Sequence, residues 1–288
     1  MSKLTSPQGI REVMEAFDFR FSKGLGQNFL ISDTVLDEIV EGSEITKDDY
    51  VLEIGPGFGT LTQALCESAG KVVSVEIDKR LREVLYCTLQ GYDNFTLIEG
   101  DILKIDLHEL VKREFEGKKI KVAANLPYYI TSPIVMMFLE SGIDLDKVTV
   151  MVQKEVAERM QAKPGTKAYG ALSVAVQYYS NPKIVSIVGK ELFMPAPKVD
   201  SAVICLDLYD EKPVKVKDEA LFFAVVKAAF GMRRKTLLNA LAGGMSLGKD
   251  LVREALENAD IDAKRRGETL SLLEFANLAD AFWAIKNS

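Results

Sequence analysis

The feature that most constrains the fold is a strand that runs directly into a glycine-rich turn. The apolar run Val51–Ile54 is followed by three glycines at alternate positions, Gly55, Gly57 and Gly59. Glycines let the backbone turn sharply and approach a ligand closely. Apolar strands then alternate with helical segments over residues 50–179, which is typical of a parallel sheet with crossover helices. The sequence therefore predicts an open α/β sheet whose ligand lies at the carboxyl ends of the strands.

The next two predicted strands each end in an acidic residue. The strand Lys71–Glu76 ends about twenty positions beyond the glycines, the spacing expected for a carboxylate on ribose hydroxyls. The strand Phe95–Asp101 ends in a second carboxylate, which can accept a hydrogen bond from an adenine amino group. Because no second dinucleotide half follows, the pattern favours S-adenosylmethionine over a nicotinamide cofactor. Taken singly, each acid could equally be a helix cap.

A further apolar run ends in the tetrapeptide Asn125-Leu126-Pro127-Tyr128. The exocyclic amine of a base is difficult to methylate because its lone pair is delocalised into the ring. An Asn side-chain oxygen and a backbone carbonyl can accept the two amine hydrogens and aim the nitrogen at a methyl donor, while Tyr128 stacks on the base. The alternative is a plain strand-to-helix turn, with Asn125 as the cap and Pro127 at the first helical position.

In their order along the chain, these motifs resemble those of the ribosomal RNA adenine dimethyltransferases. The matching segments are Gln27–Leu30, Glu53–Gly57, Glu76–Asp78, Gly100–Asp101, Asn125–Tyr128, Phe193–Ser201 and Phe230–Thr236. The resemblance covers nearly the whole chain and is closest to the bacterial members, which dimethylate two adjacent adenosines near the 3′ end of 16S ribosomal RNA. It implies an α/β fold, namely a Rossmann-like class I S-adenosylmethionine-dependent methyltransferase sheet with a smaller C-terminal α-helical domain.

The resemblance also implies roles for individual residues. The residues expected to bind S-adenosyl-L-methionine are Gln27, Asn28, Leu30, Glu53, Gly55, Gly57, Glu76, Ile77, Asp101, Ile102 and Asn125. The residues expected at the catalytic centre are Asn125, Leu126, Pro127, Tyr128 and Phe193. In this family the aromatic ring before the proline-rich loop faces the ring of the Asn-Leu-Pro-Tyr motif. We therefore expect the target adenine to lie between Phe193 and Tyr128.

The charge distribution predicts a local RNA-binding surface. The net charge of −6 is unusual for a nucleic-acid-binding protein. However, residues 220–249 contain no Asp or Glu and five Lys or Arg, so this stretch can lie along phosphates. The alternative is an ordinary solvated face. The residues expected to contact RNA are Lys154, Arg159, Lys163, Lys167, Lys198, Arg233, Arg234 and Lys235.

The pattern also predicts where the chain divides. Residues 210–213 have the composition of a linker, and the sequence beyond them is helical in character. We expect residues 1–210 to form the catalytic domain that binds S-adenosylmethionine, and residues 211–288 to form a helical RNA-binding domain. Two β-rich runs, 183–188 and 202–208, are expected to complete the sheet as an antiparallel hairpin.

Composition argues against several other classes of protein. His108 is the only histidine, which argues against a Ser-His-Asp hydrolase or a histidine-ligated metal site. The three cysteines stand apart, so neither a disulfide framework nor a zinc site is expected. No apolar run approaches the ~20 residues that span a membrane, and the N-terminus lacks the pattern of a signal peptide. We expect a cytoplasmic monomer that binds neither metal nor membrane.

Together these observations predict an enzyme that transfers methyl groups from S-adenosylmethionine to N6 of two adjacent adenosines of 16S ribosomal RNA, within the precursor of the small ribosomal subunit. One alternative is the related 23S ribosomal RNA adenine methyltransferase of the macrolide-resistance type. Pro56, Leu126 and the long C-terminal helical segment favour the small-subunit enzyme. A second alternative is a ribosome assembly factor that has lost catalysis, against which the intact Asn125 motif argues.

Overall fold

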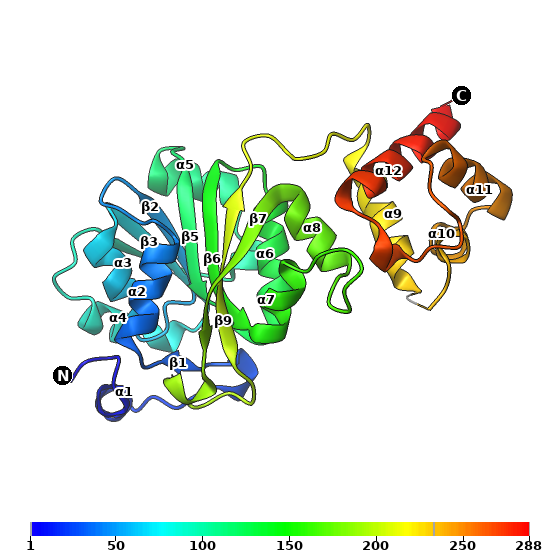
Figure 1. Ribbon diagram of the computed structural model, residues 1–288. Coiled ribbons are helices and arrows are strands. Elements are labelled where there is room, and N and C mark those ends of the chain that lie inside the picture. The colour runs from blue at the N-terminus through cyan, green and yellow to red at the C-terminus, as the bar shows by residue number, and fades with distance from the viewer. Residues whose placement is uncertain (1, 233, 288) are drawn as a thin grey trace. The chain divides into compact units, whose positions relative to one another are not determined.

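The computed structural model describes residues 2–232 and 234–287, and within them it contains a mixed seven-stranded sheet (Figure 1). The strands are β2 (Tyr50–Ile54), β3 (Lys71–Glu76), β4 (Phe95–Glu99), β5 (Ile120–Asn125), β6 (Leu145–Gln153), β7 (Ser180–Val188) and β9 (Ser201–Leu208). They lie in the order β4-β3-β2-β5-β6-β9-β7. The first five pair in parallel, and β9 is antiparallel to β6. The predicted α/β sheet is therefore confirmed, with β7 and β9 as neighbours.

Helices cover the sheet and bury its apolar strands. In the N-terminal part these are α1 (Pro7–Ala16), α2 (Asp33–Gly42), α3 (Thr60–Ser68), α4 (Arg82–Thr88), α5 (Leu107–Phe115), α6 (Thr131–Glu140) and α7 (Lys154–Met160). Ser32 caps α2, and its hydroxyl accepts a hydrogen bond from the backbone N–H of Val35. Ile39 of α2 and Leu65 of α3 pack with Val72 of β3 in one core cluster. The helices thereby fix the strand ends from which the site is built.

A small second sheet connects two distant segments of the chain. It consists of β1 (Phe29–Leu30) and β8 (Phe193–Met194), which pair in antiparallel orientation. Phe193 lies opposite Leu30 in this register. The Gln27 motif near the N-terminus is thereby held beside the loop that precedes β9.

The described chain separates into two compact units, and neither is one continuous stretch. The first contains the residues up to Ala157 together with Pro182–Leu208, and the second contains Glu158–Asn181 together with the residues from Tyr209 onward. The helices that begin in the second unit are α8 (Ala171–Tyr179), α9 (Glu219–Gly231), α10 (Leu237–Met245), α11 (Lys249–Asn258) and α12 (Leu272–Asn287). Residues 158–181 therefore group with the C-terminal helices, although they precede the last two strands. The RNA-binding role of residues 211–288 stays a prediction.

Aromatic packing explains why α8 belongs to the second unit. The ring of Tyr178 stacks on Phe222 of α9, with 4.9 Å between the ring centres. The hydroxyl of Tyr169, just before α8, donates to the backbone oxygen of Leu270 at 2.9 Å. Both contacts join residues that are far apart in the sequence, so the local pattern of residues 158–181 could not reveal this grouping.

Candidate active site

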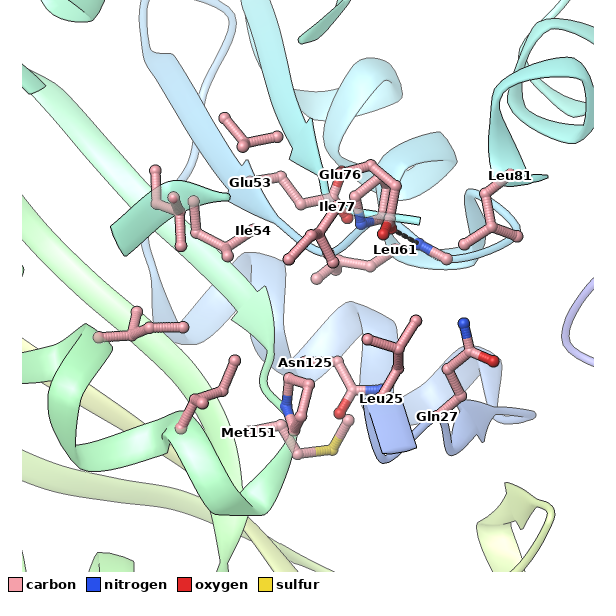
Figure 2. Close-up of a pocket in the computed structure, with 18 of the residues that line it drawn as sticks. Leu25, Gln27, Glu53, Ile54, Leu61, Glu76, Ile77, Leu81, Asn125 and Met151 are labelled. Atoms are coloured by element: carbon pink, nitrogen blue, oxygen red, sulfur yellow. Dashed lines mark hydrogen bonds between the residues drawn. The ribbon is translucent and has the colours of Figure 1, made fainter. Parts of the chain in front are cut away.

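A cavity of about 270 Å³ lies at the carboxyl ends of the parallel strands (Figure 2). Its wall includes all the residues that the sequence predicts for the cofactor, namely Gln27, Asn28, Leu30, Glu53, Gly55, Gly57, Glu76, Ile77, Asp101, Ile102 and Asn125. They come from the N-terminal segment and from the ends of β2, β3, β4 and β5. This is the place where open α/β sheets bind ligands.

The glycine-rich turn brings backbone rather than side chains to the cavity. Gly55 and Gly57 have φ of +69° and +60°, a conformation that other residues rarely adopt. A Cβ built on Gly57 would lie 2.8 Å from the ring of Phe29, whereas a Cβ on Gly55 would meet nothing within 4 Å. Gly57 is therefore required by packing as well as by φ, and Gly55 leaves open space beside the cavity.

Glu53 is a buried carboxylate with half of its hydrogen-bonding capacity unused. Its Oε2 accepts hydrogen bonds from the hydroxyls of Thr62 at 2.7 Å and Ser74 at 2.6 Å. Its Oε1 is buried and has no partner among the described residues. Burial raises the pKa of the Glu53 carboxyl to about 7, against the effect of those two hydrogen bonds. A buried acceptor without a partner indicates a ligand that donates to it.

Glu76 lies at the end of β3 and also faces the cavity (Figure 2). It accepts hydrogen bonds from the backbone N–H of Asp78 at 2.8 Å and of Gly57 at 3.4 Å. Burial is the largest cause that raises the pKa of Glu76, to about 7. Asp78 in turn accepts from the amide of Gln27 at 2.9 Å and forms an ion pair with Arg80. These bonds connect the N-terminal segment to the carboxylate at the end of β3.

The third acidic position differs from the first two because it caps a short helix. Asp101 accepts a hydrogen bond from the backbone N–H of Leu103 at 3.1 Å. The large apolar side chains of Ile77 and Leu103 also line the cavity, although about half of Ile77 is exposed to solvent. Apolar side chains beside a carboxylate suit an aromatic ring that carries an amino group. This part of the wall therefore fits an adenine.

Asn125 ends β5, and its side chain is held by the N-terminal segment. Its amide nitrogen donates to the backbone oxygen of Asn28 at 3.1 Å. The amide oxygen is therefore the group that can accept from a substrate amine. The following Leu126 is buried, and its backbone N–H donates to the backbone oxygen of Met151 at 3.2 Å. Leu126 thus anchors the motif, while Asn125 and Pro127 line the cavity.

The donor set of the cavity can be compared with the chemistry of S-adenosylmethionine. The free Oε1 of Glu53 suits an ammonium group, the carboxylate of Glu76 suits ribose hydroxyls, and the open space at Gly55 admits a close ligand. The residues present therefore fit this cofactor.

A family model described as "Ribosomal RNA adenine dimethylase" matches residues 18–278 of the chain. The chain belongs to this family. It is 56% identical, over 279 residues, to a "Ribosomal RNA small subunit methyltransferase A" from Alkaliphilus metalliredigens, and the match covers 96% of this chain and 97% of that relative.

Two solved structures give the same picture of the fold. A dimethyladenosine transferase from Plasmodium falciparum has a TM-score of 0.73 and 27% identity, with 86% of this chain and 95% of that chain covered. The 23S rRNA methyltransferase ErmE has a TM-score of 0.69 and 27% identity, with 88% and 99% covered. The chain is thus an S-adenosylmethionine-dependent methyltransferase of class I fold that belongs to the ribosomal RNA adenine dimethylases.

The structure does not bring the two expected stacking rings into the cavity. The hydroxyl of Tyr128 forms a 2.7 Å hydrogen bond with the hydroxyl of Ser201, and the ring is half-buried. Phe193 is 4% exposed and packs in the core cluster that contains Leu30. Because β1 pairs with β8, Phe193 is fixed opposite Leu30. In this conformation neither Tyr128 nor Phe193 lines the cavity, so a clamp made by both rings stays a prediction.

Several residues of the wall were missed by the sequence analysis. They include Leu25, Pro56, Thr60, Leu61, Leu103, Tyr129 and Met151. Most are apolar, and an apolar residue next to a motif carries no signal that separates a cavity wall from core packing. Tyr129 is different, because it directly follows the recognised tetrapeptide and 60% of it is exposed.

The residues predicted to contact RNA are exposed wherever the structure describes them. Lys154, Lys198, Arg159, Lys163, Lys167, Arg234 and Lys235 all lie on the surface. The first two belong to the first unit and the others to the second. Arg233 lies outside the described residues. Exposure is compatible with RNA binding and equally with a solvated face, so these contacts stay predictions.

Residues 2–232 and 234–287 contain no group of three or more His, Cys, Asp or Glu placed to hold a metal ion. In the same part of the chain, no helix is both long and apolar enough to cross a membrane.

Proposed function

We propose that the protein transfers methyl groups from S-adenosylmethionine to N6 of two adjacent adenosines near the 3′ end of 16S ribosomal RNA, during biogenesis of the small subunit. The observation that carries this proposal is the convergence of Asn125 with the carboxylates of Glu53 and Glu76 in one cavity. The printed name of the Alkaliphilus relative, which covers nearly all of this chain at 56% identity, supports the small subunit as the substrate.

In this proposal, some residues of the cavity bind the cofactor and others orient the adenine amine. S-adenosylmethionine supplies a methyl group that is already activated by its sulfonium. Glu76 would hold the ribose hydroxyls and Glu53 would accept from the ammonium group, so the cofactor would be fixed at its ribose and at its amino-acid end. The side-chain oxygen of Asn125 accepts a hydrogen bond from the adenine amine and thereby orients the amine nitrogen. Because the donor is activated, catalysis depends mainly on positioning.

The closest rival is methylation of 23S ribosomal RNA. ErmE, a 23S rRNA methyltransferase, shares 27% identity with this chain, against 56% for the small-subunit relative. Pro56 lines the cavity and Leu126 anchors the motif, and both residue types favour the small-subunit enzyme. We therefore prefer 16S ribosomal RNA as the substrate. A monomeric state and a cytoplasmic location stay predictions.

Methylation of isolated small subunits tests the proposal directly. Wild-type protein should add dimethyladenosine at two adjacent positions near the 3′ end of 16S ribosomal RNA, where primer extension will stop. Asn125→Ala should lower turnover about a hundredfold, which corresponds to the loss of roughly 3 kcal/mol in the transition state. The same assay on isolated large subunits supplies 23S ribosomal RNA, and dimethyladenosine there with none on small subunits would overturn the assignment. Full activity of Asn125→Ala would remove the residue from the mechanism.

The basic residues of the second unit are proposed to bind the phosphates of the same RNA. Changing Arg234 and Lys235 together to Ala should weaken binding to small subunits and reduce its dependence on salt, by about one unit of slope for each lost phosphate contact. Affinity for S-adenosylmethionine should be unchanged, because neither residue lines the cavity. An unaltered salt dependence would identify this surface as merely solvated.

A further inference from the structure

Tyr129 lies on the turn at the end of the Asn125 motif. It lines the cavity together with Asn125 and Pro127, yet 60% of it is exposed. An exposed aromatic residue is not unusual by itself. The preceding Tyr128 differs, because its hydroxyl forms a hydrogen bond with the hydroxyl of Ser201 and its ring does not line the cavity. Tyr129 therefore presents an aromatic ring at the mouth of the site.

The ring of Tyr129 is supported by the protein. It belongs to the short 3₁₀ turn Tyr128–Ile130, which follows Pro127 directly. A Cβ built on Gly26 would lie 3.4 Å both from Cε1 of Tyr129 and from Cβ of Pro127. Gly26 also has a φ of +61°, so a larger residue there would be strained as well as crowded. The ring thus packs against the N-terminal segment, and the rest of its surface remains available.

We propose that Tyr129 stacks on the base next to the target adenosine and so positions the RNA strand at the mouth of the cavity. This inference rests on the proposed function. The target base must reach Asn125 inside the cavity, so its neighbour in the strand remains outside, near the exposed ring. Stacking on a tyrosine tolerates any base and is favourable for a flat, apolar ring. Because the strand has a direction, the ring stacks on the neighbour on one side of the target, and for one of two adjacent adenosines that neighbour is the other adenosine.

Three variants test this role through binding as well as activity. Tyr129→Ala should weaken equilibrium binding to small subunits by roughly five- to 150-fold, which corresponds to the loss of one stacked base. Tyr129→Phe keeps the ring and should bind like the wild type. Tyr86→Ala is a matched control, because Tyr86 is 58% exposed on α4 and does not line the cavity. Binding of S-adenosylmethionine, measured by calorimetry, should be the same in all of them.

A change in the RNA identifies the stacking partner. Small subunits in which the adenosine next to the target is replaced by uridine should bind the wild type more weakly, because a pyrimidine stacks less well. On those subunits the effect of Tyr129→Ala should be smaller, since the contact that it removes is already weakened by the uridine. Equal effects of Tyr129→Ala on both kinds of subunit would overturn the inference, as would an equal loss of cofactor affinity. Methylation of unchanged subunits by the wild type tests the proposed function separately.

Discussion

The two edges of the parallel sheet bury charges in opposite ways. At the amino ends of the strands lie two buried lysines, Lys121 and Lys147, and each has acidic partners within the protein. At the carboxyl ends lie two buried carboxylates, Glu53 and Glu76, and the cavity that contains them has no Lys or Arg among its described residues. A buried charge is compatible with a stable fold where the protein supplies its ion-pair partner. Where the protein supplies none, the buried charge indicates a site for a ligand of opposite charge.

At the amino edge, each buried lysine forms ion pairs with acidic residues of the protein. The Nζ atom of Lys121 lies 3.0 Å from a carboxylate oxygen of Asp49 and 3.6 Å from one of Asp146. Lys147 lies 2.9 Å from Asp207, its partner across β6 and β9. Burial alone would raise the pKa of Asp49, but hydrogen bonds from Thr46 and Lys121 hold this pKa below its usual value. These pairs offset the free energy that the buried ammonium groups lose on leaving water.

At the carboxyl edge, the two buried carboxylates Glu53 and Glu76 have no Lys or Arg beside them in the described cavity wall. Burial raises the pKa values of both Glu53 and Glu76 to about 7, and the negative charge of Glu76 adds to the effect on Glu53. S-adenosylmethionine carries a sulfonium and an ammonium group, so it brings the positive charge that the described residues of the cavity wall lack. The same sheet therefore has one edge that stabilises the fold and one that depends on the cofactor.

The largest expected effect is at the amino edge. Lys121→Met should lower the free energy of unfolding by about 2–4 kcal/mol, because it removes the cation that pairs with Asp49 and the donor to the backbone oxygen of Glu44. Chemical denaturation measures this, with Lys118→Met at an exposed ion pair as the control, where little change is expected. Cofactor affinity of the folded variant should match that of the wild type. A strong loss of affinity would show that the two edges are not independent.

Removing a carboxylate from the carboxyl edge should weaken cofactor binding and leave stability nearly unchanged. Glu76→Ala should weaken binding of S-adenosylmethionine by roughly 1.5–3 kcal/mol, the range for hydrogen bonds to a charged group, without a comparable loss of stability. Glu99→Ala is the matched control, because Glu99 pairs with Glu76 in the register of β3 and β4 but does not line the cavity. Calorimetric titration of both variants decides the matter. Equal affinities would mean that Glu76 serves the turn rather than the cofactor.

Glu53→Gln should change how the stability of the cofactor-free protein depends on pH. A carboxyl whose pKa is higher in the folded than in the unfolded protein binds its proton more tightly when folded. Its contribution to stability is therefore favourable at low pH and is lost as the pH rises from about 4.5 to about 7. Glu53→Gln should stabilise the cofactor-free protein by about 1–2 kcal/mol at pH 8 and by almost nothing near pH 4.5. Thermal unfolding at both values tests this, and a variant that is less stable at pH 8 would contradict it.

The smallest expected effect is on the pH dependence of binding. The ammonium group of the cofactor needs the ionised form of Glu53, whereas a protonated Glu76 still offers an acceptor oxygen to a ribose hydroxyl. Affinity should therefore be full above pH 8 and should fall by about tenfold on going to pH 6. Calorimetry at pH 6, 7 and 8 measures this, and protons should be released on binding near neutral pH. Glu53→Gln should show a flatter profile than the wild type. An affinity that does not change with pH would place the pKa of Glu53 well below 6.

The residues expected to bind the cofactor all lie in the cavity wall, and most of the polar ones end a strand or follow a glycine. Position in a βα unit is a local property, and parallel strands bring their carboxyl ends together without further information. The place of Phe193 could not be predicted in the same way, since it depends on the pairing of β1 with β8 across most of the chain. The pair of Lys121 and Asp49 is equally invisible, because a buried lysine in a strand looks like an exposed one until its neighbours are known.

The interrupted course of the chain through its two units has a consequence for synthesis. The chain leaves the first unit after Ala157, returns at Pro182 and leaves again after Leu208. On the ribosome, β6 therefore emerges well before β9, the strand that covers its free edge. The aromatic partner of Tyr178, Phe222, is made later still. A nascent chain of this protein thus carries an uncovered apolar strand and an unpacked helix together, and it can finish neither unit until translation has passed Leu208.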